Sequence, residues 1–250
     1  MKQNRKLGAI ILAAGRGTRM NSQNTNKVAM MLADKPLILR SVNLLEKMDF
    51  GQIIVVVGFA KESVKKVLKN TSVIFAQQKK LLGTADAVKS ALSKLSPSIS
   101  EVLVIQGDDS HFYKEEIISK LIDLHYKEKA AITFLTIELK NPFGLGRILR
   151  SRDGKVDGII EEKDATEKTR KITEINPACY IFTVNFLKKY LPKIIMNQIT
   201  GEYYLTDLIE IAVKNNEKIA TLKTADMPWR GVNTKEELEE AEKIFSDLVE

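Results

Sequence analysis

Short apolar runs alternate with helical patterns along the first half of the chain, and this alternation constrains the fold more than any other feature. The runs are LGAIIL (7–12), IIVVVG (53–58), SVIFA (72–76) and EVLVIQGD (101–108), and the helical stretches that follow them are 36–48, 61–70, 85–95 and 114–129. An apolar run without polar alternation fits a strand that is covered on both sides. The pattern therefore predicts an α/β fold, with a Rossmann-like, mostly parallel mixed sheet and helices on both faces.

The second half has a different rhythm and predicts an α+β extension of the same sheet. Longer strands are expected at 130–139 and 178–183, together with a hairpin around Asp153–Gly154, a favourable turn pair. A helix at 204–216, a strand at 218–224 and a helix at 234–250 close the chain. We expect one domain over residues 1–250, with a nucleotide-binding half to about 130 and a sugar-binding half from about 131.

Composition excludes several classes of protein. None of the apolar runs in the 250 residues approaches the ~20 residues of a membrane span, so we expect no membrane partner. The net charge is +7, but the lysines are scattered over helical patterns, which argues against nucleic acid. The single cysteine, Cys179, is typical of a reducing compartment and a cytoplasmic protein. The sequence does not determine the oligomeric state.

The loop after the first run, LAAGRGTRM (12–20), carries the main functional signal. Small residues there allow backbone N–H groups to approach a phosphate, while Arg19 and Lys27 supply positive charge. The loop is neither a dinucleotide fingerprint, because residue 20 is Met20, nor a P-loop. A glycine-rich turn without a ligand is the alternative. Loops 77–87 and 106–109 follow two further strands, and the carboxyl ends of parallel strands share one crevice.

Ordered motifs resemble a known family. They are LAAGRGTRM with Lys27, LGTADAV (82–88), GDD (107–109), GLGRI (144–148), GIIEEKDAT (158–166), EIN (174–176), GEYYLTD (201–207) and GVNT (231–234). Together they resemble the sugar-1-phosphate nucleotidyltransferases, and are most similar to the uridyltransferase domain of bacterial N-acetylglucosamine-1-phosphate uridyltransferases. The resemblance covers roughly residues 7 to 240.

The resemblance implies that UTP and N-acetylglucosamine 1-phosphate react to give UDP-N-acetylglucosamine and pyrophosphate. The sugar phosphate is already an anion, so catalysis needs positioning and charge neutralisation rather than a strong base. By similarity Arg19 and Lys27 are catalytic, and Asp108 and Asn233 bind Mg²⁺. From the residues alone, Asp108 could instead be a turn residue, and Asn233 could cap the last helix. His111 and His125 are expected to be structural.

The same resemblance assigns the substrate contacts. The nucleotide-binding residues are Leu12, Ala13, Ala14, Gly15, Gly17, Gln78, Gly83, Thr84 and Gly107. The sugar-binding residues are Gly146, Glu161 and Asn176. Gln78 can offer both a donor and an acceptor to uracil. Glu162 rivals Glu161, because neighbours in a strand point to opposite faces. Tyr203 and Tyr204 are candidates for a pocket wall or for the core.

Departures from the family pattern fall near the expected sugar and metal sites. Asn26 stands where a proline is usual, Asp109 follows the metal aspartate, and INPAC (175–179) replaces INTG or INAG. Glucose 1-phosphate, another nucleotide, or a non-catalytic regulatory subunit therefore stay as alternatives. Asp109 could add charge near the metal. The hexapeptide repeats of an acetyltransferase domain are absent from the sequence, so we expect no acetyltransferase activity.

Overall fold

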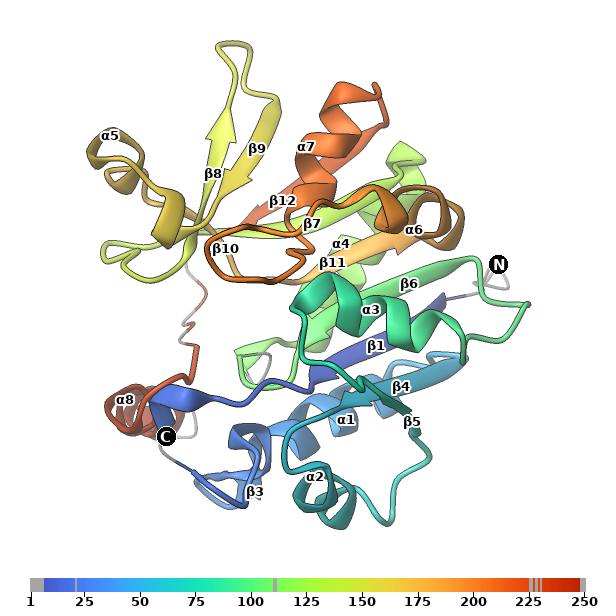
Figure 1. The fold of residues 1–250 in the computed structure, drawn as a ribbon, viewed down its shortest axis with the longest axis vertical. Helices are drawn as coiled ribbons and strands as arrows, with labels where there is room; N and C mark the ends of the chain where they lie inside the picture. Colours follow the sequence, from blue (N-terminus) through green and yellow to red (C-terminus); the bar gives the residue numbers. More distant parts are fainter. Residues whose placement is uncertain are drawn as a thin grey trace.

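The central sheet of this computed structural model has ten strands, drawn in Figure 1. The structure describes residues 7–20, 22–109, 112–224, 227, 229 and 231–247. The strands are β1 (Leu7–Ala13), β4 (Gln52–Val57), β5 (Ile74–Gln77), β6 (Glu101–Gln106), β7 (Ile132–Glu138), β8 (Gly146–Arg150), β9 (Val156–Ile160), β10 (Glu174–Asn176), β11 (Tyr180–Thr183) and β12 (Ile219–Thr224). A separate two-stranded ribbon joins β2 (Met31–Leu32) to β3 (Lys35–Pro36).

The first half of the sheet is parallel. β5, β4, β1 and β6 lie side by side in that order, and each pair of neighbours is parallel. The register puts Leu12 opposite Val56 on one side and Gln106 on the other, so these strands end nearly level. Their carboxyl ends therefore form one edge of the sheet, where the expected nucleotide loops begin.

The second half makes the sheet mixed. β11 is antiparallel to both β6 and β7 and joins the two halves. β10 continues along the same edge of β7, while β12 pairs in parallel with the opposite edge. The hairpin β8–β9 extends the sheet beyond β10, with the predicted turn at Asp153–Gly154. Figure 1 shows this hairpin at the far end of the molecule from β4 and β5.

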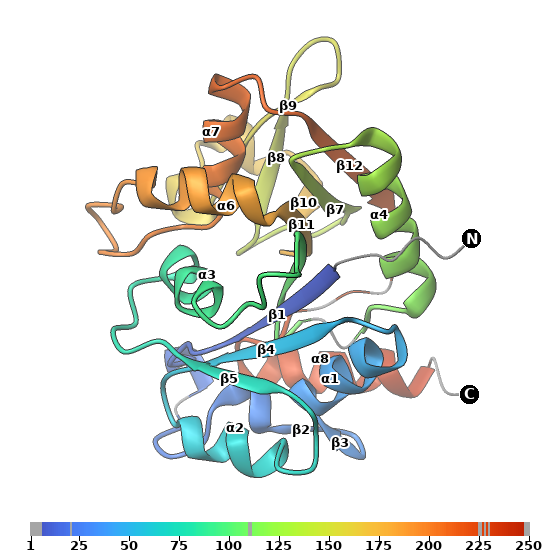
Figure 2. The same cartoon turned by 90° about the vertical axis from the view of Figure 1, so that its right-hand side faces the viewer.

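Helices cover both faces of the sheet, as predicted. One face carries α3 (Thr84–Leu92), α6 (Val184–Tyr190) and α7 (Asp207–Lys214), and the other carries α1 (Leu37–Lys47), α2 (Lys61–Val67) and α4 (Glu115–Glu128). Figure 2 shows α3, α6 and α7 on one side and α4 on the other. Neighbouring residues of β1 point into opposite cores: Ile10 packs in the core beneath α3, α6 and α7, and Ile11 in the core beneath α1, α2 and α4. None of the helices among the described residues is long and apolar enough to cross a membrane.

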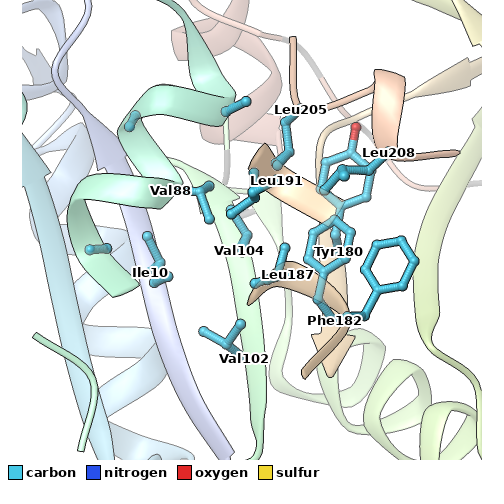
Figure 3. Packing of buried hydrophobic residues seen from close by; sticks show 14 of the residues in the cluster. Ile10, Val88, Val102, Val104, Tyr180, Phe182, Leu187, Leu191, Leu205 and Leu208 are labelled. Carbon is cyan, nitrogen blue, oxygen red and sulfur yellow. The ribbon is translucent and has the colours of Figure 1, made fainter. Parts of the chain in front are cut away.

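The core on the α3 side joins the two halves of the chain. Figure 3 shows Ile10, Val88 and Val104 of the first half beside Tyr180 and Leu208 of the second. Phe134, Tyr180 and Phe182 continue as neighbouring rings, with 5.9 Å and 5.4 Å between successive centroids. This continuous apolar core holds the second half at a fixed position beside the parallel strands.

The structure corrects several predicted boundaries. α7 begins at Asp207 rather than Tyr204, and α2 ends at Val67 rather than Asn70. β10 was not predicted as a strand. α8 (Lys235–Asp247) falls within the predicted last helix, whose final three residues lie outside the described residues. α5 (Glu167–Arg170) is a single short turn between β9 and β10.

Candidate active site

The glycine-containing loop leaves β1 at the carboxyl edge and is fixed from both sides. The carbonyl of Leu12 accepts a hydrogen bond from Gly107 N–H at 2.9 Å, and the carbonyl of Ala14 accepts one from Phe59 N–H at 3.0 Å. Leu12, Ala13 and Ala14 are buried, whereas Gly15 is exposed. The start of the loop is therefore held in place, and the loop then opens to solvent.

Asn26 anchors the same loop, and the sequence did not indicate this role. Its buried side-chain amide donates to the carbonyls of Ala13 and Gly15 at 3.1 Å each, and to that of Phe59 at 2.9 Å. Its Oδ1 accepts from Val28 N–H at 3.2 Å and caps the short turn that begins at Lys27. The residue that replaces the family's proline therefore fixes both the loop and the start of the lysine segment.

Lys27, Asp108 and Asn233 meet at one point, although 206 residues separate the first and the last. The aliphatic stem of Lys27 packs over Gly17, so that a Cβ on Gly17 would lie 3.2 Å from Lys27 Cδ. The Lys27 ammonium forms an ion pair with the Asp108 carboxylate and donates to Asn233 Oδ1 at 2.9 Å. One expected cation and both expected metal ligands therefore share one site.

The structure separates the two roles considered for Asn233. Thr234 Oγ1 accepts from Glu237 N–H at 3.2 Å, and the Glu237 carboxylate accepts from Asn233 N–H at 2.7 Å. Thr234 is therefore the N-cap of α8, and Glu237 reaches back to the N–H of the residue before the cap, in a variant of the capping box. The side chain of Asn233 is consequently left to face Lys27 and Asp108.

Asp108 and Asn233 fit a magnesium ion by their chemistry. Both direct a side-chain oxygen to the position of the Lys27 ammonium, itself a cation, and Mg²⁺ prefers oxygen ligands and keeps several waters or substrate oxygens. Within the described part of the chain, His, Cys, Asp and Glu side chains form no group of three or more that could hold a metal. Two protein oxygens are thus the donor set that this site offers.

Asp109, the next residue, lies in a different environment. Its Oδ1 is buried without a hydrogen-bond partner among the described residues. Burial, reinforced by the charge of Asp108, raises the pKa of Asp109 well above its usual value. A carboxyl group that binds its proton so firmly carries less negative charge than the sequence suggests.

Gln78 and Gly83 lie on the loop between β5 and α3, and Thr84 is the first residue of α3. The side-chain NH₂ of Gln78 donates to the Gly83 carbonyl at 3.0 Å and to Asp86 Oδ2 at 2.8 Å. Both of its donor hydrogens are therefore engaged within the protein, and only Oε1 remains for a ligand. The expectation that Gln78 offers both a donor and an acceptor to uracil is not met by this geometry.

The loop that carries Gly83 is bonded to the second half of the chain. Tyr203 N–H donates to the Leu82 carbonyl at 2.8 Å, Ala85 N–H donates to the Tyr203 carbonyl at 3.0 Å, and Leu205 N–H donates to Thr84 Oγ1 at 2.9 Å. Gly83 has φ +94°, and a Cβ there would lie 2.6 Å from the Tyr203 carbonyl oxygen. Only glycine fits this approach.

Gly146, Glu161 and Asn176 also come together. Gly146 of β8 is the register partner of Asn176 of β10, and a Cβ on Gly146 would lie 3.6 Å from Glu161 Oε2. Glu161 Oε1 accepts from Thr206 Oγ1 at 2.9 Å, and Asn176 Nδ2 bonds the Tyr180 hydroxyl. Thr206 was not singled out in the sequence. The Gly146 backbone and the Glu161 carboxylate thus lie at one position, with Asn176 beside Gly146 across the β8–β10 pair.

Glu162 points to a different position from Glu161, and the two are not strand neighbours as expected, because β9 ends at Ile160 and Glu162 begins a 3₁₀ turn. It forms ion pairs with Arg147 Nη2 at 2.7 Å and Arg170 Nε at 3.2 Å, and accepts from Gly144 N–H at 3.1 Å. The Arg147 side chain is only 2% exposed. Arg147 directly follows Gly146, and Glu162 directly follows Glu161. The Arg147–Glu162 ion pair therefore helps to fix the positions of these two expected sugar-binding residues.

Negative charge accumulates beside the expected sugar-binding residues. Burial raises the pKa of Glu161. Burial, together with the charges of Glu161, Glu210 and Asp164, raises the pKa of Asp207 to about 6. Ionisable groups shifted in this way gather at functional sites.

Other expected residues stand apart from this cluster. Arg19 is exposed and forms no ion pair with any carboxylate that the structure describes. Tyr204 donates its hydroxyl to Thr200 Oγ1 at 2.8 Å. His125 is buried between Thr133 and Glu101, which is a structural environment, and His111 lies outside the described residues.

Comparisons with known proteins show the family of this chain. Residues 8–247 match the nucleotidyl transferase family. A bifunctional protein GlmU from Caldicellulosiruptor saccharolyticus is 43% identical over 94% of this chain and 50% of its own length, and one from Thermoanaerobacter pseudethanolicus is 41% identical over 96% and 51%. The chain therefore spans about half the length of these relatives.

A solved structure agrees in fold. A Bacillus anthracis protein described as a glucose-1-phosphate thymidylyltransferase superimposes with a TM-score of 0.79 at 20% identity, with 96% of each chain covered. The sheet and its loops thus define a nucleotidyltransferase fold. This chain belongs to the nucleotidyl transferase family, which confirms the resemblance carried by its motifs.

Proposed function

We propose that this chain transfers a uridylyl group from UTP to N-acetylglucosamine 1-phosphate, with release of pyrophosphate. The observation that carries the proposal is the convergence of Lys27, Asp108 and Asn233 beside the glycine-containing loop. The names of the GlmU relatives and the motif pattern support it. Glucose 1-phosphate and other nucleotides are the alternative substrates.

The reaction joins two anions. An oxygen of the sugar phosphate attacks the α-phosphorus of UTP, a new P–O bond forms, and the bond to the β-phosphate oxygen breaks. Pyrophosphate leaves with that electron pair. No proton must be removed from the nucleophile, so the protein contributes mainly position and positive charge.

The residues divide this work between them. The backbone of the loop from Leu12 to Gly17 holds the triphosphate, and Arg19 and Lys27 neutralise it. Asp108 and Asn233 would hold Mg²⁺, which supplies Lewis-acid stabilisation of the phosphate oxygens when bound. In the structure the Lys27 ammonium is bonded to Asp108 and Asn233, so it must turn toward the phosphates when the metal and substrates bind.

The sugar would lie against Gly146, Glu161 and Asn176. Glu161 Oε2 has no bond to Thr206 and can accept from a hydroxyl. Ala178 takes φ +55°, the left-handed conformation that the family's glycine allows, and its N–H donates to Asn176 Oδ1 at 3.1 Å. The INPAC departure therefore keeps the turn that orients Asn176, which favours an unchanged sugar.

Pyrophosphate release tests the proposal. The full chain is assayed with Mg²⁺ and UTP, CTP, dTTP, ATP or GTP, each with N-acetylglucosamine 1-phosphate or glucose 1-phosphate. We expect the UTP and N-acetylglucosamine 1-phosphate pair to dominate, and Asp108→Ala to abolish release. Asp157→Ala, which removes an exposed carboxylate on β9, should retain full activity.

The other outcomes are distinct. Dominant release with another pair would keep the chemistry and reject the substrate. No release with any pair would refute transfer and favour a nucleotide-binding regulatory subunit. Activity that survives Asp108→Ala would refute the metal assignment.

A further inference from the structure

Asp86 is a charged residue at the nucleotide loop to which the family resemblance gives no role. It lies in the first turn of α3, partly buried, and its Oδ2 accepts from Gln78 Nε2 at 2.8 Å. The second hydrogen of the same NH₂ group goes to the Gly83 carbonyl at 3.0 Å. A carboxylate and a backbone carbonyl can only accept hydrogen bonds.

These two acceptors fix the orientation of the Gln78 amide. If the amide turned over, Oε1 would face two acceptors and both hydrogen bonds would be replaced by repulsion. A hydrogen bond to a charged acceptor is about twice as strong as one between neutral groups, so Asp86 holds the larger share of this preference. The side chain of Gln78 is therefore locked rather than free to rotate.

The oxygen of that amide is the group left for a ligand. Gln78 is 4% exposed, and Oε1 accepts from no donor among the described residues. Gln78 follows β5 at the carboxyl edge, where its N–H is bonded to the Val57 carbonyl at 2.9 Å.

We infer that Asp86 is a positioning residue that makes Gln78 a pure hydrogen-bond acceptor and so selects the base of the nucleotide. Uracil and thymine carry an N3–H between two carbonyls, which Oε1 can accept. Cytosine carries an unprotonated N3 in the same place and would meet oxygen with a lone pair. A site built to bond a donor strongly rejects the analogue that lacks it.

This inference rests on the proposed function, because it names the part of that site that reads the base. It also differs from an assignment of Gln78 alone. A glutamine without Asp86 could turn its NH₂ toward cytosine, so the selectivity belongs to the pair.

The test compares base selectivity in matched variants. The ratio of kcat/KM for UTP to that for CTP is measured with the preferred sugar 1-phosphate for the unaltered chain, Asp86→Ala and Asp86→Asn. Lys89→Ala, which changes an exposed side chain on the same helix, is the control. Affinities for UMP and CMP are measured by calorimetry in parallel.

We expect Asp86→Ala to lower the UTP to CTP ratio roughly tenfold or more, mainly through better use of CTP. Asp86→Asn keeps an oxygen that can accept, and should fall between the two. Lys89→Ala should leave the ratio unchanged. A purely structural role for Asp86 would lower activity with both nucleotides and leave their ratio intact.

The outcomes distinguish the role of Asp86 from the proposed function. A ratio that is unchanged in Asp86→Ala while the unaltered chain prefers UTP would overturn the inference and leave the proposed function standing. If no substrate pair is turned over, the proposed function fails, and the UMP and CMP affinities decide. Preference for UMP that Asp86→Ala removes would support the role of Asp86, and equal affinities in the unaltered chain would overturn it.

Discussion

Ala178 holds a backbone conformation that an L-residue adopts at a cost, and replacing it with glycine should relieve that cost. Its φ is +55°, and it stands where the family commonly has glycine. The left-handed conformation costs an L-residue about 1–2 kcal/mol. The Ala178→Gly variant removes this strain.

Two smaller effects oppose the gain. Glycine adds about 0.4–1 kcal/mol of conformational entropy to the unfolded chain. The methyl group of Ala178 is partly buried against the core, and its loss costs roughly 0.4 kcal/mol, half of a fully buried methylene. The balance is a net stabilisation of about 0.5 kcal/mol.

A second alanine-to-glycine variant serves as the control, because it should lower stability where Ala178→Gly raises it. Ala91 is fully buried within α3, where glycine carries no conformational advantage. Ala91→Gly should cost about 1 kcal/mol in helix propensity and about 0.8 kcal/mol in lost burial. The two variants should therefore differ by about 2 kcal/mol, which corresponds to about 4 °C in Tm for a chain of this length.

Urea unfolding and thermal melts measure the difference. Ala178→Gly keeps the N–H that bonds Asn176 Oδ1, so the KM for the sugar phosphate should stay unchanged. If Ala178→Gly lowered stability as much as Ala91→Gly, the residue would not be strained and the reasoning would be wrong.

Three further predictions concern the site. The Lys27→Ala variant should bind Mg²⁺ more tightly than the unaltered chain, measured by calorimetry without nucleotide, because the ammonium no longer pairs with the expected metal ligands. Its turnover should fall by about 10²–10³. An unchanged Mg²⁺ affinity would contradict this. A pKa of about 6 for Asp207 means that the folded protein binds this proton more firmly than the unfolded chain, so stability falls as pH rises between about 4 and 6 and then stays level. Asp207→Asn should reduce that fall by about 1 kcal/mol after solvent screening, measured as urea midpoints between pH 4.5 and 8; an identical pH profile would refute it. Arg147→Ala removes the buried partner of Glu162, which keeps Arg170 and the Gly144 N–H, and should cost about 1–3 kcal/mol in urea unfolding. Lys120→Ala, which breaks an exposed ion pair, should hardly change stability, and an equal loss in the two variants would contradict this prediction.

The parallel half of the fold was predictable because its strands are unbroken apolar runs. Burial on both faces leaves no polar positions in them, and that pattern survives in the sequence. β10 was missed because it has only three residues, EIN, one of which is a charged glutamate. Its place is set by pairing with β7 and β8, which are distant in the sequence.

The candidate site was predictable as a set of residues but not as a set of contacts. The motifs place Lys27, Asp108 and Asn233 in one expected site, and their side chains meet in the structure. They did not show that Thr234, rather than Asn233, caps α8, or that Asp86 engages the donor of Gln78. Such pairings depend on side chains that meet only after the loops are folded, so local sequence carries no signal for them.

The hydrogen bonds between Leu82, Thr84 and the segment around Tyr203 have a thermodynamic consequence. They connect the loop expected to hold the base to the segment 203–206. That segment ends at Thr206, whose hydroxyl is bonded to Glu161. A ligand that displaces or stiffens one segment must act on the other. Linkage then requires the effect to be reciprocal: if nucleotide strengthens the binding of sugar phosphate by some factor, sugar phosphate strengthens the binding of nucleotide by the same factor.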